Sequence, residues 1–213
     1  KRQEGIRSNS VYSLLVDDRG AVWVGHFQAG LDYSLYQNGL FRTYAYPPLF
    51  NSANLSIRSF ISRGQEKVIG SRDGLFYINE ATGMVKSFVK PVLTSDLILT
   101  ISFYQGEYYI GTYGGGMMVL NPETLSLKYF SQSDTELFQK GHIFCVKPDT
   151  KGNLWIGTSQ GLFNYNGQTK QIKHFTSANS QLLEGNVYEV SFDSTGKGWI
   201  ATETGMCIYD PAS

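Results

Sequence analysis

The chain has 213 residues, of which 41% are hydrophobic, and its 18 basic residues balance 18 acidic ones. This length and apolar content suffice for a hydrophobic core. The zero net charge, with no cluster of Lys or Arg, argues against nucleic-acid binding and against a polybasic membrane anchor. No apolar run approaches the roughly 20 residues of a membrane-spanning helix, so we expect no direct membrane contact.

Gly contributes 23 residues and aromatic residues make up 14% of the chain, which favours many short strands joined by tight turns. Cys145 and Cys207 lie in apolar stretches without metal-binding spacing, so we expect two buried free thiols. The chain starts at Lys1 without a Met or a signal peptide, and we expect it to be a trimmed fragment.

One pattern occurs five times along the chain. A triplet ending in Gly or Ala is followed, a few residues later, by Gly and then Leu or Met. The triplets begin at Trp23, Val68, Tyr109, Trp155 and Trp199, at intervals of 45, 41, 46 and 44 residues. Five copies at a period near 44 indicate a structural repeat.

Each repeat predicts four short strands. An alternating strand (11–16, 143–147, 187–192) leads into a polar turn with Asp and Gly, and the triplet forms the second strand. A third strand follows the Gly (75–78, 117–120, 162–165), and a fourth is rich in Phe, Tyr, Lys and Ser (85–89, 127–130, 172–175). The helical feature that we expect is a single turn around 135–139.

Four antiparallel strands per repeat form the blade of a β-propeller. We therefore predict an all-β propeller of about five blades, a single domain or fragment over residues 1–213. The repeats lie at about 8–46, 54–90, 96–131, 141–176 and 185–213. The first residue of each triplet is expected to pack between blades, and its Gly to allow close backbone approach.

The last repeat shows three strands only. Either residues 1–7 supply its outer strand and close a five-bladed ring, or the chain is part of a longer ring, such as a seven-bladed one.

The segment Asp-x-x-Gly-Asn-Leu-Trp-Ile-Gly-Thr-x-x-Gly-Leu, residues 149–162, resembles the two-component regulator propeller repeat. That repeat occurs in periplasmic sensor regions of hybrid two-component systems, especially from Bacteroides-type bacteria. Residues 17–31 and 193–206 match well, whereas the second repeat departs most, with Val68 in place of Trp, and the fifth has Ala201 where Gly is usual.

The resemblance implies a sensory, non-catalytic segment of a periplasmic ectodomain in an inner-membrane sensor histidine kinase. Such a protein would bind an oligosaccharide and control, through a phosphorelay, the transcription of glycan-use genes. The resemblance also implies an adjacent propeller or immunoglobulin-like domain in the same parent chain, and a homodimer of the parent. It implies no cofactor.

The loops between second and third strands share one face of a propeller with the loops between blades, and ligands usually bind there. Aromatic rings beside amide, guanidinium and carboxylate groups suit sugars. The predicted ligand-binding residues are His26, Phe27, Gln28, Arg72, Asp73, Tyr113, Gln160 and Glu203. These loops could instead be solvated, or could dock onto a neighbouring domain.

No metal site is predicted, because His26, His142 and His174 are few and scattered. His142 is expected on the ligand face and His174 on an outer strand. Residues 114–116, three glycines, are predicted to form a blade turn and not a phosphate loop. Two alternatives stay open: a propeller lyase or glycosidase that uses Asp73, Glu203 or His26, and a protein-interaction scaffold without a small ligand.

Overall fold

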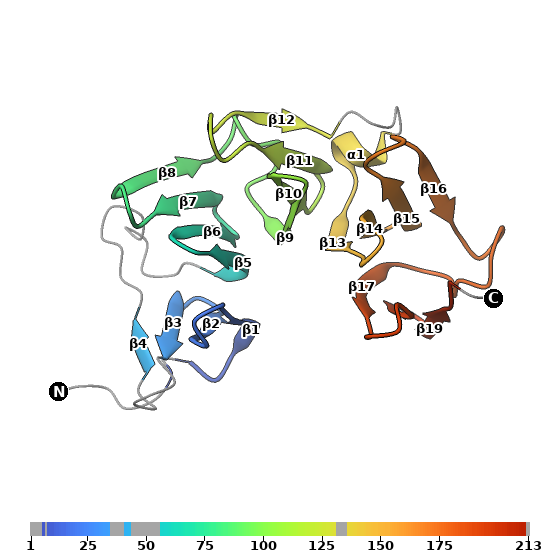
Figure 1. Cartoon of the computed structure of the whole chain (residues 1–213), viewed down its shortest axis with the longest axis horizontal. Coiled ribbons are helices and arrows are strands. Elements are labelled where there is room, and N and C mark those ends of the chain that lie inside the picture. The colour runs from blue at the N-terminus through green and yellow to red at the C-terminus, as the bar shows by residue number, and fades with distance from the viewer. Residues whose placement is uncertain (1–5, 7, 35–40, 44–55, 131–135, 212–213) are drawn as a thin grey trace. The chain divides into compact units, whose positions relative to one another are not determined.

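The structure is a computed structural model, and it describes residues 6, 8–34, 41–43, 56–130 and 136–211 (Figure 1). The chain divides into two compact units, Lys1–Ile98 and Leu99–Ser213. In both units the described strands form separate antiparallel sheets in which neighbours along the chain pair with each other. This is the predicted all-β propeller with five blades, numbered here in chain order.

The first unit contains two four-stranded blades. Their strands are β1 (Val11–Val16), β2 (Val22–His26), β3 (Leu31–Ser34) and β4 (Phe41–Thr43), then β5 (Ile57–Arg63), β6 (Glu66–Ser71), β7 (Leu75–Asn79) and β8 (Met84–Phe88).

The second unit contains two four-stranded blades and a three-stranded one. The third blade consists of β9 (Ile98–Tyr104), β10 (Glu107–Thr112), β11 (Met117–Leu120) and β12 (Leu127–Tyr129). The fourth consists of β13 (Ile143–Pro148), β14 (Asn153–Thr158), β15 (Gly161–Asn166) and β16 (Ile172–Phe175). The fifth consists of β17 (Val187–Phe192), β18 (Gly198–Thr202) and β19 (Gly205–Tyr209). The predicted helical turn is α1 (Leu137–Lys140).

The same close contact recurs between neighbouring blades at the glycine of the triplet. A Cβ atom at Gly157 would lie 2.7 Å from the carbonyl oxygen of Val187, the first residue of the next inner strand. A Cβ atom at Gly111 would likewise lie 2.7 Å from Cγ2 of Ile143. The predicted close backbone approach is therefore confirmed at Gly157, because any larger residue there would push against the Val187 backbone; the atoms nearest to Gly111 belong to side chains.

An aspartate organises the first turn of two blades. The carboxylates of Asp17 and Asp149 each accept backbone N–H groups two and four residues later, and the indole N–H of the Trp six residues later, at 2.8–3.0 Å. Burial acts to raise the pKa of both carboxyl groups, but these hydrogen bonds outweigh it and hold the pKa below its usual value. The turn and the interblade Trp are thus fixed by one side chain.

The interblade position is buried in four blades, as predicted, but not in the fifth. Trp23, Val68, Tyr109 and Trp155 are buried, whereas Trp199 is 40% exposed. The expectation was wrong for Trp199 because no described strand covers that face of the fifth blade. Cys145 is buried as predicted, but Cys207 is only half-buried, because its strand β19 pairs with β18 alone among the described residues.

The triple-glycine segment forms a turn between β10 and β11. The hydroxyl of Thr112 accepts a hydrogen bond from the backbone N–H of Gly115 and donates one to the carbonyl of Gly116. These contacts confirm the predicted blade turn.

Candidate ligand-binding surface

Four inner strands carry a β-bulge at the same place. In β1, β5, β13 and β17 the register shifts between the first and third residues, so the second residue has no direct partner on the neighbouring strand. These second residues are Tyr12, Arg58, Phe144 and Tyr188. Bulges re-aim side chains and are frequent beside binding sites, so the repeated bulge places a large side chain at one point of each of these blades.

In the second unit the bulge residues belong to a continuous aromatic strip. The strip consists of Tyr113, His142, Phe144 and Tyr188, and successive ring centroids lie 4.0, 6.2 and 5.1 Å apart. Tyr113 stacks on His142 and is 50% exposed, and Tyr188 is 44% exposed. Ring faces of this kind can stack against the C–H faces of a sugar or against other aromatic groups.

Polar groups lie at one end of the strip. The side-chain amide of Asn186 donates a hydrogen bond to the hydroxyl of Tyr188 at 3.1 Å, and the backbone N–H of Asn186 donates to the carboxylate of Glu203 at 3.3 Å. Within the strip, Nδ1 of His142 is buried and has no hydrogen-bond partner. The surface therefore combines ring faces with a carboxylate, an amide and an unused imidazole nitrogen.

The first unit contains a related cluster. The guanidinium of Arg58 lies 4.6 Å from the ring centroid of Tyr12, and the ring centroids of Phe27 and Tyr12 lie 5.3 Å apart. Phe27 follows β2 and Tyr113 follows β10, so the two clusters are built from corresponding loops and bulges. Each combines one loop aromatic with bulge residues of two inner strands.

The predicted ligand-binding residues differ in where they lie in the structure. Tyr113 and Glu203 lie at the two ends of the connected set in the second unit, and Phe27 belongs to the cluster of the first unit. His26 is completely buried, and its Nε2 lies 3.0 Å from a carboxylate oxygen of Asp32. Its ligand role stays a prediction, although this pair already gives it a structural role. The sequence prediction missed Phe144, Tyr188 and Asn186.

The other four predicted residues are exposed and contact the fold through their backbones. The backbone N–H groups of Gln28 and Asp73 donate to the hydroxyls of Ser56 and Ser71, respectively. The backbone N–H of Arg72 donates to the carbonyl of Ser56. The carbonyl of Gln160 lies 2.7 Å from Nε2 of His174, which is exposed on β16 as predicted. The side chains of these residues stay candidates for ligand contacts.

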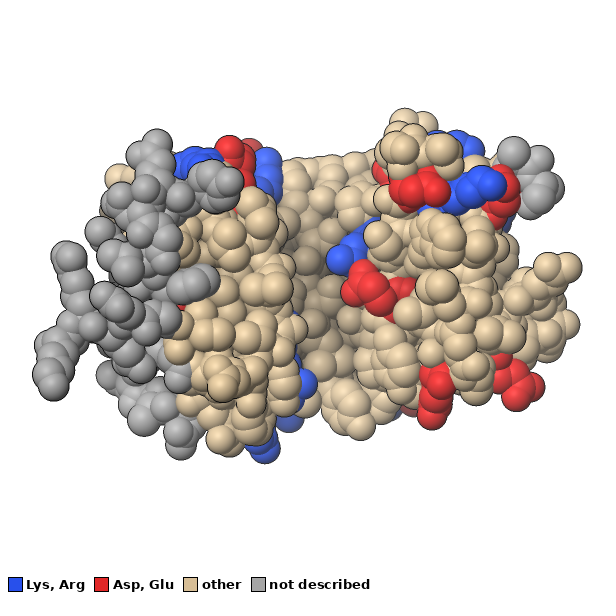
Figure 2. Space-filling model, turned by 90° about the horizontal axis from the view of Figure 1, so that it is seen from below, with Lys and Arg blue, Asp and Glu red and all other residues tan. Residues whose placement is uncertain are grey.

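Charge is dispersed on the described surface. In the view of Figure 2, basic and acidic residues lie in several small groups, some of them mixed, without one large basic patch. In the described ranges, no cluster of three His, Cys, Asp or Glu side chains could hold a metal ion. No helix in the same ranges is long and apolar enough to span a bilayer.

Two stretches, residues 5–28 and 138–160, match the family model of the two-component regulator propeller. They include the first two strands of the first and fourth blades. These two stretches are similar to two-component regulator propeller repeats. The strongest resemblance in the sequence, at residues 149–162, overlaps the second of these repeats.

Solved structures with the same fold include two extracellular domains. The extracellular domain of the hybrid two-component system BT3049 from B. thetaiotaomicron is 26% identical, with a TM-score of 0.74 over 98% of this chain and 28% of that one. The extracellular domain of BT4673 from the same organism is 19% identical, with a TM-score of 0.63 over 97% of this chain and 32% of that one. This chain thus spans less than a third of either domain.

A third similar structure is PorZ, a surface component of the type-IX secretion system of Porphyromonas gingivalis. It is 17% identical, with a TM-score of 0.72 over 93% of this chain and 32% of that one. At this identity the likeness concerns the fold alone, as it does for BT4673. None of the curated proteins matches the sequence.

Proposed function

We propose that this chain is a segment of the sensory ectodomain of a hybrid two-component signalling protein. The propeller repeats and the likeness to the BT3049 extracellular domain support this function. The segment binds its ligand without turnover, and the parent protein passes the signal to a phosphorelay that controls glycan-use genes. A ligand shifts such a system only if it binds one arrangement of the receptor better than another.

The ligand is an oligosaccharide that binds on the aromatic strip. The observation that carries this proposal is the row of connected rings from Tyr113 to Tyr188, because exposed ring faces beside polar groups are what sugars require. Asn186 and Glu203 supply a donor and an acceptor for sugar hydroxyls at one end.

Neighbouring parts of the parent chain cover the exposed apolar side chains of the first and fifth blades. Leu14 and Val16 of β1 are largely exposed, as are Met206 and Ile208 of β19. Apolar side chains gathered on one face mark a contact surface. The occupants are further blades, an adjacent propeller or an immunoglobulin-like domain, and the parent protein is a periplasmic homodimer.

The test measures thermal unfolding with a panel of plant, host and yeast oligosaccharides. A glycan at 100 times its dissociation constant stabilises the folded chain by about 2.7 kcal/mol, which raises the Tm by roughly 5–10 °C for a chain of this size. Tyr113→Ala is expected to abolish the shift. Tyr129→Ala is the matched control, because Tyr129 is equally exposed but lies on the outer strand β12, outside the strip.

Three outcomes contradict parts of the proposal. If no glycan moves the Tm, oligosaccharide binding is wrong. If Tyr113→Ala retains the full shift, the ligand binds away from the strip. If the active glycan is recovered cleaved, the chain is an enzyme, and Asp73→Asn and Glu203→Gln then identify the carboxylate responsible.

A further inference from the structure

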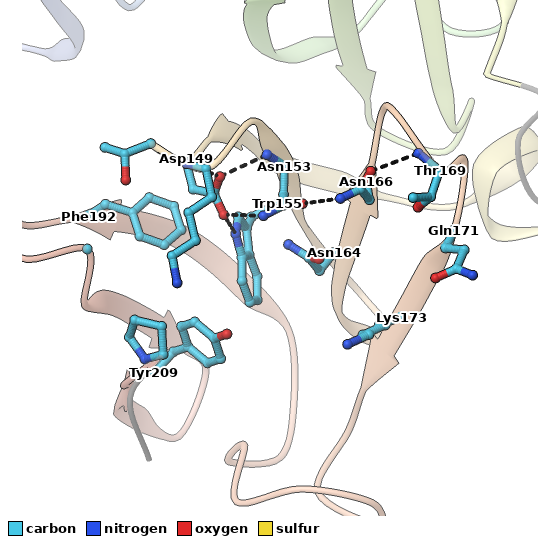
Figure 3. Close-up of a pocket in the computed structure, with 14 residues that line it drawn as sticks. Asp149, Asn153, Trp155, Asn164, Asn166, Thr169, Gln171, Lys173, Phe192 and Tyr209 are labelled. Carbon is cyan, nitrogen blue, oxygen red and sulfur yellow. Dashed lines mark hydrogen bonds between the residues drawn. The ribbon is translucent and has the colours of Figure 1, made fainter.

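A second concave site lies at the opposite end of the fourth blade from the loops of the aromatic strip. A cavity of about 270 Å³ is lined by the β13–β14 turn, the β15–β16 turn and two rings of the fifth blade, Phe192 and Tyr209 (Figure 3). Sites for drug-sized ligands occupy roughly 300–1,000 Å³, so this cavity suits a ligand of about one sugar ring.

Asn164 makes this blade unlike the others. It pairs in register with Trp155, on the third strand of the blade. In each of the four remaining blades, one third-strand residue likewise pairs in register with the interblade residue. These third-strand residues are Tyr33, Tyr77, Val119 and Ile208. The repeat therefore favours an apolar or aromatic residue here, and the fourth blade has an amide.

The amide nitrogen of Asn164 is buried and has no hydrogen-bond partner. Buried donors are nearly always paired, because leaving one unpaired costs free energy. In Figure 3 the Asn164 amide and the Lys173 amine point toward the same space beside the Trp155 ring, and the two residues pair in register across β15 and β16. The unpaired donor thus lies where a bound acceptor would meet a positive charge.

The Asp149 carboxylate and the side-chain oxygens of Asn153 and Asn166, which line the cavity, already accept hydrogen bonds from the protein. Both carboxylate oxygens of Asp149 accept two hydrogen bonds each. The side-chain oxygen of Asn153 accepts from Asn166, whose own oxygen accepts two backbone N–H groups. Among the described residues, neither Lys151 nor Lys173 forms an ion pair. The groups that a ligand can engage here therefore include one unpaired amide donor and two ammonium groups.

We propose that this cavity binds the carboxylate of an acidic sugar, one hexuronate residue in size. The carboxylate accepts hydrogen bonds from the Asn164 amide and the Lys173 ammonium group, and the sugar ring lies against Tyr209. Charge-assisted hydrogen bonds of this kind are stronger than neutral ones, which explains selection of the acid over the neutral sugar. This site shares no residue with the aromatic strip, so it stands independently of the function proposed above.

The experiment titrates the full chain with D-glucuronate and with D-glucose as the neutral partner. Glucuronate at ten times its dissociation constant is expected to raise the Tm by about 3–6 °C, and glucose to leave it unchanged. Lys173→Met is expected to weaken glucuronate binding at least tenfold. Lys128→Met is the matched control, because Lys128 holds the corresponding register position on β12 and pairs with Glu107 at 2.9 Å.

Asn164→Leu provides a second readout that needs no ligand. It restores the apolar residue of the other blades, so this variant is expected to melt no lower than wild type while losing the glucuronate shift. The proposal is wrong if glucuronate and glucose act alike, if glucuronate has no effect, or if Lys128→Met weakens binding as much as Lys173→Met. Tyr113→Ala is expected to retain the glucuronate shift, which separates failure at this site from failure at the strip.

Discussion

Replacing Gly157 by Ala tests the joint between the fourth and fifth blades. The new Cβ would lie 2.6 Å from Sγ of Cys145, 2.7 Å from the carbonyl oxygen of Val187 and 3.0 Å from its Cγ1. The sulfur can move by side-chain rotation. The carbonyl oxygen belongs to the backbone of β17, so relief there requires the two blades to separate.

The expected cost follows from two opposing effects. Overpacking of a well-packed core typically costs about 1–3 kcal/mol. Gly→Ala without a strained backbone stabilises a protein by about 0.4–1 kcal/mol through the unfolded chain, and Gly157 has no left-handed φ to strain. The net loss is about 1–2 kcal/mol, which lowers the Tm by roughly 2–8 °C in a chain of this length.

The assay compares thermal unfolding of Gly157→Ala with that of Gly198→Ala. Gly198 also has an ordinary φ, but the atoms nearest to its added Cβ are side-chain atoms of Phe192 and Tyr209 at 3.0 Å or more. We expect Gly198→Ala to melt close to wild type. If Gly157→Ala melts within a degree of wild type, or if both variants lose the same stability, the blade joint does not limit packing.

Three further predictions concern single side chains. Asp149→Ala is expected to cost about 1–3 kcal/mol in a denaturant titration, because it leaves the indole N–H of Trp155 without its acceptor. The folded-state pKa of Asp149 lies below its ordinary value of 3.8, so its carboxylate stabilises the fold above that pH and this contribution is lost as the pH falls further. Thermal melts of wild type should therefore show a loss of stability at low pH that Asp149→Ala lacks. If Asp149→Ala loses as much stability at low pH as wild type, this reasoning is wrong. Burial raises the pKa of Cys145 to about 12, so a thiol reagent at pH 8 is expected to label Cys207 and not Cys145 in the native chain, and equal labelling would refute the burial. Trp199→Phe should remove most of the fluorescence that acrylamide quenches, because the other two indoles are buried.

The strands and blades could be predicted from the sequence because several residues of the repeat each have a single structural role. The triplet glycine must accept the next inner strand, and the Asp six residues before the Trp must accept its indole N–H, so both recur at fixed spacing. Burial of Trp199 could not be predicted in this way, because it depends on a neighbouring blade and not on the repeat itself.

The candidate site was predicted only at its ends. Tyr113 and Glu203 lie in loops that the propeller topology brings to one face, which is a rule about folds. Phe144 and Tyr188 lie inside strands, where an aromatic residue ordinarily signals a core position. The missing signal was the bulge, although aligning the inner strands would have shown Tyr12, Phe144 and Tyr188 at one shared position.

The glycine joint also bears on how propellers of this kind change in size. Every complete blade carries both halves of the joint, a glycine on one side and an aliphatic first residue on the other, as in Gly25 with Ile57 and Gly157 with Val187. A duplicated blade would therefore already carry the glycine and the aliphatic residue that its two neighbouring blades require. Gene duplication can lengthen such an array without inventing a new contact, which leaves the bulge and loop positions free to diverge from blade to blade.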